Sequence, residues 1–148
     1  MLLLVQQSQQ RIGLRGHVKM LQSTSNSVPI SFGILSSIIV VPKFFASQVS
    51  QEQQRAVLLH EMAHLDRRDS YVGLLQEVCH ALYWWHPWIL RRSKELDQLR
   101  ELLCDHRVVE IEGDGRTLAE ALLQVAQCAV EPRLRLPCLS SIGDEFED

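Results

Sequence analysis

The stretch His60-Glu61-Met62-Ala63-His64 determines more of the fold and chemistry of this chain than any other. On a helix, residues four apart lie on one face, so both imidazoles can reach a single ion. Zinc accepts neutral imidazole nitrogens, and a catalytic zinc keeps one coordination position open for water. Glu61, next to the first histidine, can take a proton from that water. These five residues predict metal-assisted hydrolysis, most often of a peptide bond.

The residues around this motif predict that it lies on a buried helix. Ser50 and Gln53 have the spacing of a capping box, which marks a helix start. The histidines are surrounded by apolar residues: Ala56, Val57, Leu59, Met62, Ala63 and Leu65. Two unpartnered imidazoles in such a helix would lose hydration without a compensating contact. Metal ligation therefore explains the histidine pair better than a solvated helix does.

A catalytic zinc needs a third protein ligand. Arg67 and Ser70 stand where an extended motif would place glycine and a third histidine, which rules that motif out. The remaining candidates are Asp66, Asp69, Glu77, His80, His86, Glu95, Asp97, Glu101 and Asp105. Asp66 and Asp69 follow His64 too closely to fold back onto its ion, and we expect them to cap helix ends.

Glu101 and Asp105 are the best-placed pair, because a spacing of four puts them on one helix face. A metal-bound imidazole usually donates its second N–H to a carboxylate, which fixes the ring. Glu101 then serves as the third ligand and Asp105 as the acceptor for a ligand histidine. The alternative is a Glu/Asp pair on a solvated face. It is disfavoured by the apolar residues that flank the pair, Leu99, Leu102, Leu103 and Cys104.

With these motifs, the chain resembles the zinc domain of the BlaR/MecR-type membrane metallopeptidases, which are bacterial antirepressor sensor-transducers. The shared blocks are HExxH followed by Arg-Arg-Asp (67–69), an aromatic stretch with a proline (83–87), and Arg-Glu-x-x-Cys-Asp (100–105). Upstream, the apolar segments 28–35 and 38–42 are similar to the strand pair of that family. The resemblance covers roughly residues 10 to 130, with the blocks in the family's order.

The resemblance implies a mainly helical α+β fold of the zincin-like (gluzincin) type, with a small β-sheet before the HExxH helix. It implies one zinc ion per chain on His60, His64 and Glu101, with Glu61 as the general base and Asp105 in support. The implied activity is that of a zinc endopeptidase, the catalytic domain of a membrane-bound sensor-transducer protease. By analogy with related zinc proteases, an edge strand is expected to hold an extended peptide substrate. Its residues are Ile38, Ile39, Val40 and Val41.

The expected substrate is a protein or peptide, either a transcriptional repressor or the protein itself. The full-length protein is expected in the bacterial cell membrane, with flanking transmembrane helices and this domain on the cytoplasmic side. The present chain alone is expected to be soluble. A net charge of −3 without a basic patch argues against nucleic acid as a partner.

Other functions remain open at this point. A non-proteolytic zinc-binding regulatory module would keep the three ligands, but it needs no general base, so Glu61 disfavours it. A membrane zinc protease of the CAAX-processing or heat-shock type shares HExxH and Glu-x-x-x-Asp. Against it stand the Arg-Arg-Asp and aromatic–proline blocks. A purely structural helical domain leaves the histidine pair unexplained.

The length of 148 residues and a hydrophobic content of 46% support a single domain with a real core. We predict a metallopeptidase domain over residues 1–131 and a flexible tail over 132–148. Helices are predicted at about 2–11, 50–65, 70–83, 89–109 and 117–130. Strands are predicted at about 18–21, 30–35 and 38–41.

Four aromatic residues lie close together in the sequence: Tyr83, Trp84, Trp85 and Trp88. Such residues suit a bilayer interface, where their amphipathic rings lie among the headgroups. We favour the alternative, in which they pack in a core or against another helix.

Overall fold

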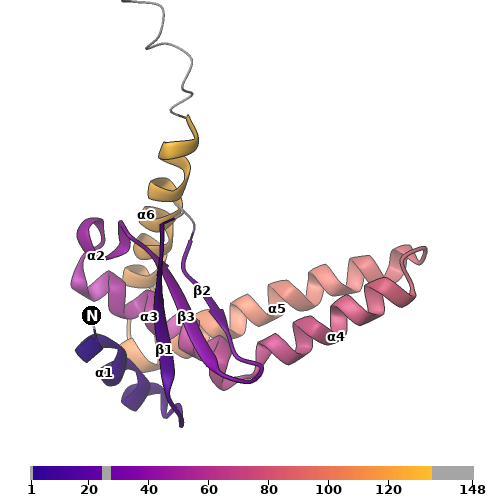
Figure 1. Ribbon diagram of the computed structural model, residues 1–148, viewed down its shortest axis with the longest axis horizontal. Helices are drawn as coiled ribbons and strands as arrows, with labels where there is room; N and C mark the ends of the chain where they lie inside the picture. The colour runs from indigo at the N-terminus through magenta and orange to yellow at the C-terminus, as the bar shows by residue number, and fades with distance from the viewer. Residues whose placement is uncertain (1, 25–27, 135–148) are drawn as a thin grey trace, which may run out of the picture.

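A two-helix arm projects from the body of the molecule in the computed structural model (Figure 1). The structure describes residues 2–24 and 28–134. The body holds a small sheet and the helices α1 (Leu2–Ile12), α2 (Phe45–Gln48), α3 (Gln51–Asp66) and α6 (Gly115–Leu134). The arm consists of α4 (Asp69–Leu82) and the facing part of α5 (Pro87–Glu112). This arrangement confirms the predicted mainly helical α+β class, with the sheet preceding the HExxH helix.

Helix α3 is the centre of the core. The predicted capping box is present, because the Gln53 amide donates to Ser50 Oγ at 3.3 Å and the Ser50 amide donates to Gln53 Oε1 at 3.2 Å. The helix contacts α1, α4, α5, α6 and β2, and therefore buries residues all around its axis. Its least exposed apolar side chains are Val57, Leu58, Leu59 and Met62, none above 1%. This central position holds the HExxH motif rigidly.

The sheet has three strands in the order β1-β3-β2, namely β1 (Val18–Ser23), β3 (Ser37–Pro42) and β2 (Ile30–Phe32). Strand β3 pairs in parallel with β1 and in antiparallel with β2. The prediction that residues 38–41 (Ile38, Ile39, Val40, Val41) form an edge strand is therefore wrong. Both hydrogen-bonding edges of β3 are paired, one by β1 and the other by β2, so this strand lies in the middle of the sheet.

The last helix begins earlier and ends later than predicted. Asp114 caps its start, where Oδ1 accepts from the Arg116 amide at 2.9 Å and Oδ2 accepts from Thr117 Oγ1 at 3.1 Å. These bonds lower the pKa of the Asp114 carboxyl. Because α6 continues to Leu134, the predicted tail does not begin at 132. The rest of that tail, residues 135–148, lies outside the described residues.

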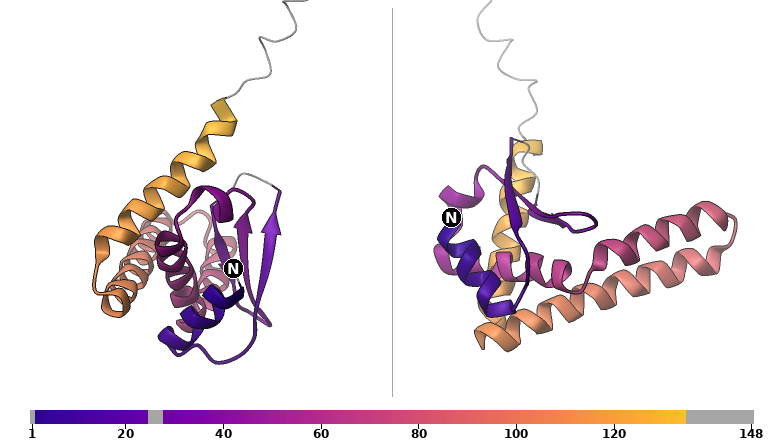
Figure 2. Two further views of the ribbon diagram at one scale, coloured as in Figure 1. Left: turned by 90° about the vertical axis from the view of Figure 1, so that its left-hand side faces the viewer. Right: turned by 60° about the horizontal axis from the view of Figure 1, so that its bottom comes forward.

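The arm has a polar interior. Gln76 Nε2 donates to the Ser93 carbonyl at 3.3 Å and to Asp97 Oδ1 at 3.0 Å, and His80 Nε2 lies 2.8 Å from Ser93 Oγ. The right-hand view in Figure 2 shows the arm standing clear of the body. Its tip consequently has no neighbour to cover it among the described residues. The aromatic residues at the tip, Tyr83, Trp84, Trp85 and Trp88, are 46–72% exposed, so the prediction that they pack is wrong.

Candidate metal centre

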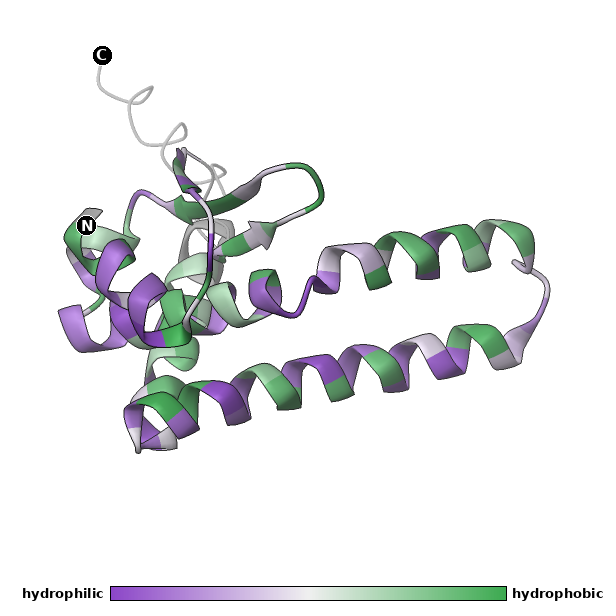
Figure 3. Cartoon of the chain, turned by 90° about the horizontal axis from the view of Figure 1, so that it is seen from below, coloured by the Kyte–Doolittle hydropathy of each residue, from purple (hydrophilic) through white to green (hydrophobic). Residues whose placement is uncertain are grey.

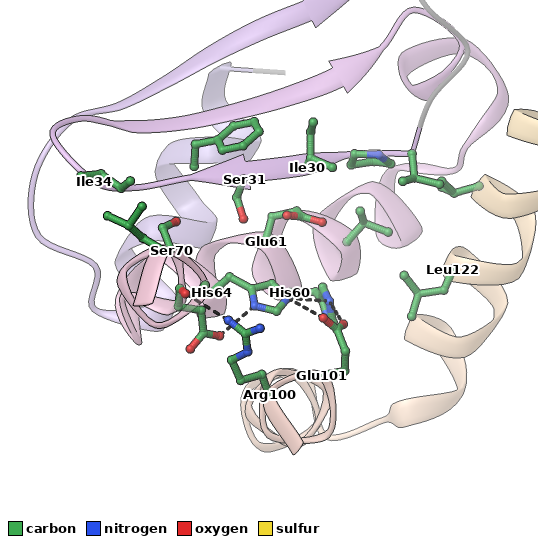
Figure 4. A pocket seen from close by; sticks show the side chains of 18 residues that line it. Ile30, Ser31, Ile34, His60, Glu61, His64, Ser70, Arg100, Glu101 and Leu122 are labelled. Carbon is green, nitrogen blue, oxygen red and sulfur yellow. Dashed lines mark hydrogen bonds and ion pairs between the residues drawn. The ribbon is translucent and has the colours of Figure 1, made fainter. Parts of the chain in front are cut away.

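Helices α3 and α5 bring the three predicted ligands together (Figure 4). His60 Nε2 lies 3.2 Å from His64 Nε2. Glu101 Oε2 lies 3.4 Å from His60 Nε2, and Glu101 Oε1 lies 3.7 Å from His64 Nε2. The i, i+4 spacing on α3 places the imidazoles side by side, and α5 packs across them with its carboxylate.

These separations suit a tetrahedral ion. Zinc bonds of about 2.0–2.1 Å at tetrahedral angles place neighbouring ligand atoms about 3.3 Å apart. The observed distances of 3.2, 3.4 and 3.7 Å are close to that value, and a small side-chain rotation would correct the difference. The Glu101 side chain is 61% exposed, so the site opens to solvent on one side. The residues present therefore fit a zinc ion with a free coordination position.

A carboxylate stands behind each histidine. His64 Nδ1 lies 2.9 Å from Asp69 Oδ2, and His60 Nδ1 lies 3.0 Å from Asp105 Oδ1. The second pair is off the line of an ideal hydrogen bond, and neither atom has another partner within residues 2–24 and 28–134. A small rotation of the His60 ring would align it. Asp105 thus lies against His60, one of the two histidines predicted to be ligands.

The two carboxylates favour a particular tautomer of each histidine. With a proton on each Nδ1 facing a carboxylate, both Nε2 atoms of His60 and His64 present lone pairs toward each other and toward Glu101. A direct hydrogen bond between the Nε2 atoms would need one ring to move its proton, leaving a bare Nδ1 against a carboxylate. The three electron-rich groups lie within 4.8 Å of one another and form a donor set that a metal ion can share.

Sequence reasoning missed Asp69, which it assigned to a helix cap. Asp69 is 7% exposed and its side chain caps no helix. Its carboxylate contacts Nδ1 of His64 and accepts a hydrogen bond from Arg67 Nε at 3.4 Å. Arg68 explains the placement, since its left-handed conformation (φ 58°) turns the chain sharply between α3 and α4. A residue five positions after His64 can thereby reach the back of its ring. The Arg-Arg-Asp block was the sequence feature that could have indicated this contact of Asp69.

Cys104 completes the support of His64. Its sulfur lies 3.3 Å from His64 Nδ1 and 3.7 Å from Asp69 Oδ2. These three residues form a second possible metal cluster. Burial, reinforced by the negative charge of Asp69, raises the pKa of the Cys104 thiol to about 12. Cys104 is buried and does not line the cavity, so its side chain packs behind His64, away from the cavity and the ligand cluster.

A cavity of about 710 Å³ opens over the ligand cluster. Figure 4 shows Glu61 between β2 and the histidine pair, with Ser31 of β2 above it. Glu61 is 8% exposed and lines this cavity, together with Arg100. Apolar side chains form much of the remaining wall, among them Val28, Ile30, Phe32, Ile34, Leu74 and Leu122. The cavity therefore joins the Glu61 carboxylate, the cluster of His60, His64 and Glu101, and an apolar wall.

Strand β2, not β3, borders the cavity. Residues 38–41 are absent from its lining, whereas Ile30, Ser31 and Phe32 contribute to it. In the part of the chain that the structure describes, β2 pairs along one side only. Hydrophobic alternation identifies strands but not their order, so the sequence pattern could not separate the two.

Comparison with known proteins places these features in a family. The family model described as BlaR1 peptidase M56 matches residues 2–144. Regulatory protein BlaR1 from Bacillus licheniformis is 32% identical over 99 residues, which is 66% of this chain and 16% of that protein. The methicillin resistance mecR1 proteins of Staphylococcus aureus and Staphylococcus epidermidis are each 26% identical over 95 residues, 64% of this chain and 16% of each relative. The present chain thus spans a small part of these curated relatives, and it belongs to the M56 family of BlaR1-type metallopeptidases.

Proposed function

We propose that this domain is a zinc-dependent endopeptidase, the catalytic part of a membrane-bound regulatory protease. One observation carries the proposal. Two Nε2 atoms and a carboxylate converge at 3.2–3.7 Å, while a carboxylate lies behind each imidazole. Such a donor set, with a carboxylate base beside it in a cavity, is the arrangement that metal-assisted hydrolysis requires.

Each protein group has a defined task in this proposal. His60, His64 and Glu101 hold one zinc ion, which when bound acidifies a water molecule and polarises the scissile carbonyl. Glu61 accepts the proton of that water and delivers it to the leaving amine nitrogen. Asp69 and Asp105 keep the two rings in the orientation and tautomer that ligation needs.

The substrate is an extended segment of a protein, either a repressor or the protein itself. Its backbone adds to the free side of β2 (Ile30–Phe32), the strand that borders the cavity. The apolar wall formed by Phe32, Ile34, Leu74 and Leu122 favours apolar side chains next to the scissile bond. This replaces the initial hypothesis that residues 38–41 hold the peptide.

A non-proteolytic zinc module is the main competing function. It would need the three ligands but not a carboxylate facing the same cavity, so the position of Glu61 favours the enzyme. The match to the M56 family supports this type of protease over the CAAX-processing or heat-shock type.

The test compares Glu61→Gln with Glu52→Gln, a matched change at an exposed glutamate in the first turn of the same helix. Zinc-loaded variants are incubated with unfolded casein, and the products, including self-cleavage products, are identified by mass spectrometry. We expect Glu61→Gln to lower the rate about 10²–10⁴-fold with zinc still bound, because the general base is lost. Glu52→Gln should retain the wild-type rate. Equal rates in the two variants would remove Glu61 from the mechanism, and an inactive zinc-loaded wild type would favour the regulatory module.

A further inference from the structure

The outward side of α4 carries a stripe of exposed apolar residues. We define this outer stripe as Leu75, Val78 and Leu82, which are 47–63% exposed; Tyr71, which donates to the Ile34 carbonyl, and Leu74, which lines the cavity, continue it toward the body. At 100° per residue these positions fall within one sector of about 100°. Gly73, Gln76 and His80 lie on the opposite side and face α5. Helix α4 is thus polar toward α5 and apolar toward solvent, the reverse of a helix in an ordinary soluble hairpin.

The tip of the arm extends this apolar surface. The tip cluster consists of Tyr83, Trp84, Trp85 and Trp88, with Trp84 72% exposed. The view coloured by hydropathy shows apolar residues along α4 up to the tip (Figure 3). Exposed apolar surfaces of this extent mark interaction sites, because water contact with them is unfavourable.

Cations lie beside the tip cluster. Exposed Arg91, Arg92 and Lys94 follow Trp88 within the next two turns of α5, and Glu95, the one acidic residue in the segment 83–96, pairs with Arg92 at 2.7 Å. The Arg92 guanidinium stacks 4.5 Å from the centre of the Trp88 ring. Aromatic rings with neighbouring arginines and lysines are the composition that interfacial membrane segments use, since the rings lie among the headgroups and the cations meet anionic phosphates.

The length of α4 limits how the arm can contact a bilayer. The 14 residues of α4 span about 21 Å, less than the roughly 30 Å hydrocarbon core of a bilayer. No helix in residues 2–24 and 28–134 is both long and apolar enough to cross a membrane. A segment of these dimensions reaches into one leaflet without spanning it.

We propose that the arm docks on a lipid bilayer with anionic headgroups, inserting the outer stripe and the tip cluster into one leaflet. The tip carries three cations, Arg91, Arg92 and Lys94, and one carboxylate, which pairs with Arg92; this excess of positive charge favours an anionic surface as the occupant. The inference rests on the arm alone and does not depend on hydrolysis. The arm continues directly from the metal centre, since α4 begins with Asp69 and α5 carries Glu101, so docking would hold the cavity near the membrane surface.

The chain itself contains the probe for a test. Its three tryptophans are Trp84, Trp85 and Trp88, so intrinsic fluorescence reports the tip alone. The full chain is titrated with vesicles of phosphatidylcholine alone, and with equimolar phosphatidylcholine and phosphatidylglycerol. We expect a blue shift of the emission, stronger binding to the anionic vesicles, and quenching by lipids brominated near the headgroup end of the acyl chain. No lipid-dependent shift together with no sedimentation with vesicles would overturn the proposal.

Two variants and a control separate the contributions. Leu75→Ser with Leu82→Ser should weaken partitioning about tenfold or more on both vesicle types, because the variant loses the apolar surface that the two leucines bury in the bilayer. Arg91→Gln with Arg92→Gln should weaken it by about tenfold on anionic vesicles only. The matched control is Leu3→Ser with Leu123→Ser, at residues of the body that are 73% and 60% exposed. The proposal fails if this control loses as much binding, or if the shift follows protein concentration without lipid, as dimerisation through the arm would require.

Discussion

Helices α3 and α4 follow one another in the sequence, yet they bury opposite kinds of residue. Ten of the 16 residues of α3 are buried, including His60 and Glu61. Only two of the 14 residues of α4 are buried, Asp69 and Gln76, and both are polar. Helix α3 lies in the middle of the body, whereas α4 has α5 as its main neighbour beyond the turn that joins it to α3. The position of a helix in the fold, more than its composition, decides which of its residues leave water.

The buried polar groups of both helices hold geometry. In α3, His60 and Glu61 face the candidate metal centre, and Gln54 donates to the Val49 carbonyl. In α4, Gln76 fixes the arm against α5, and Asp69 fixes the start of the arm against His64. The apolar residues of α3 stabilise the fold, while the exposed ones of α4 remain available to a ligand or surface. The two helices should therefore respond differently to the same substitution.

The largest difference is expected in stability. Leu59→Ala in α3 removes a side chain with 0% exposure and should lower the free energy of unfolding by about 2–5 kcal/mol. Leu75→Ala in α4 changes a residue that is 63% exposed, so the free energy of unfolding should change by no more than about 0.5 kcal/mol. Urea titration followed by circular dichroism measures both. Similar losses in the two variants would mean that α4 is covered in solution.

The next effect concerns Asp69, the one acidic residue of α4 that serves the core site. Asp69→Asn keeps the shape but weakens the acceptor for His64 Nδ1, so zinc affinity should fall about tenfold or more. Asp66→Asn, at an exposed position on the last turn of α3, is the control. Affinity is measured by competition with a chromogenic chelator. Unchanged affinity in Asp69→Asn would make its contact with His64 a packing contact only.

Asp105→Asn should have a similar effect of about tenfold at most, because Asp105 is 43% exposed and its contact with His60 Nδ1 is less well aligned. Glu110→Gln, further along α5, controls for the loss of one negative charge. The same chelator competition applies. If the two variants bound zinc equally well, Asp105 would act as a surface residue.

The smallest effect distinguishes two thiols, Cys104 behind the metal centre and Cys79 on the arm. Burial raises the pKa of the Cys104 thiol to about 12, so little thiolate forms near pH 8 and the folded chain should protect it from iodoacetamide. Partly exposed Cys79 should react first. Peptide mass spectrometry over time gives both rates. Reaction of Cys104 as fast as that of Cys79 would contradict its placement behind His64.

Local signals predicted much of this fold. The pair Ser50 and Gln53 located the start of α3 to the residue, and the i, i+4 rule placed His60 beside His64 and Glu101 near Asp105. These features depend on helix geometry alone, which spacing reveals directly. The roles of the residues as ligands and base remain predictions.

Tertiary arrangement accounts for what the sequence did not reveal. Strand order depends on which neighbour each strand finds, so alternation at 38–41 looked the same for a central strand as for an edge. Asp69 reaches His64 only because Arg68 adopts a left-handed conformation that side chains seldom favour. An apolar stripe predicts that a helix face avoids water, but it does not say what covers that face, and this is why the exposure of Trp84 and its neighbours was unexpected.

The amount of zinc bound per chain tests the central claim most directly. Purified wild type, Glu61→Gln, Glu101→Ala and the exposed control Glu77→Ala are equilibrated with a zinc buffer, and their metal content is measured by atomic emission. We predict one zinc per chain in the wild type, Glu61→Gln and Glu77→Ala, with a marked loss in Glu101→Ala. Full occupancy in Glu101→Ala, or no stoichiometric zinc in the wild type, would contradict a metal centre built from His60, His64 and Glu101.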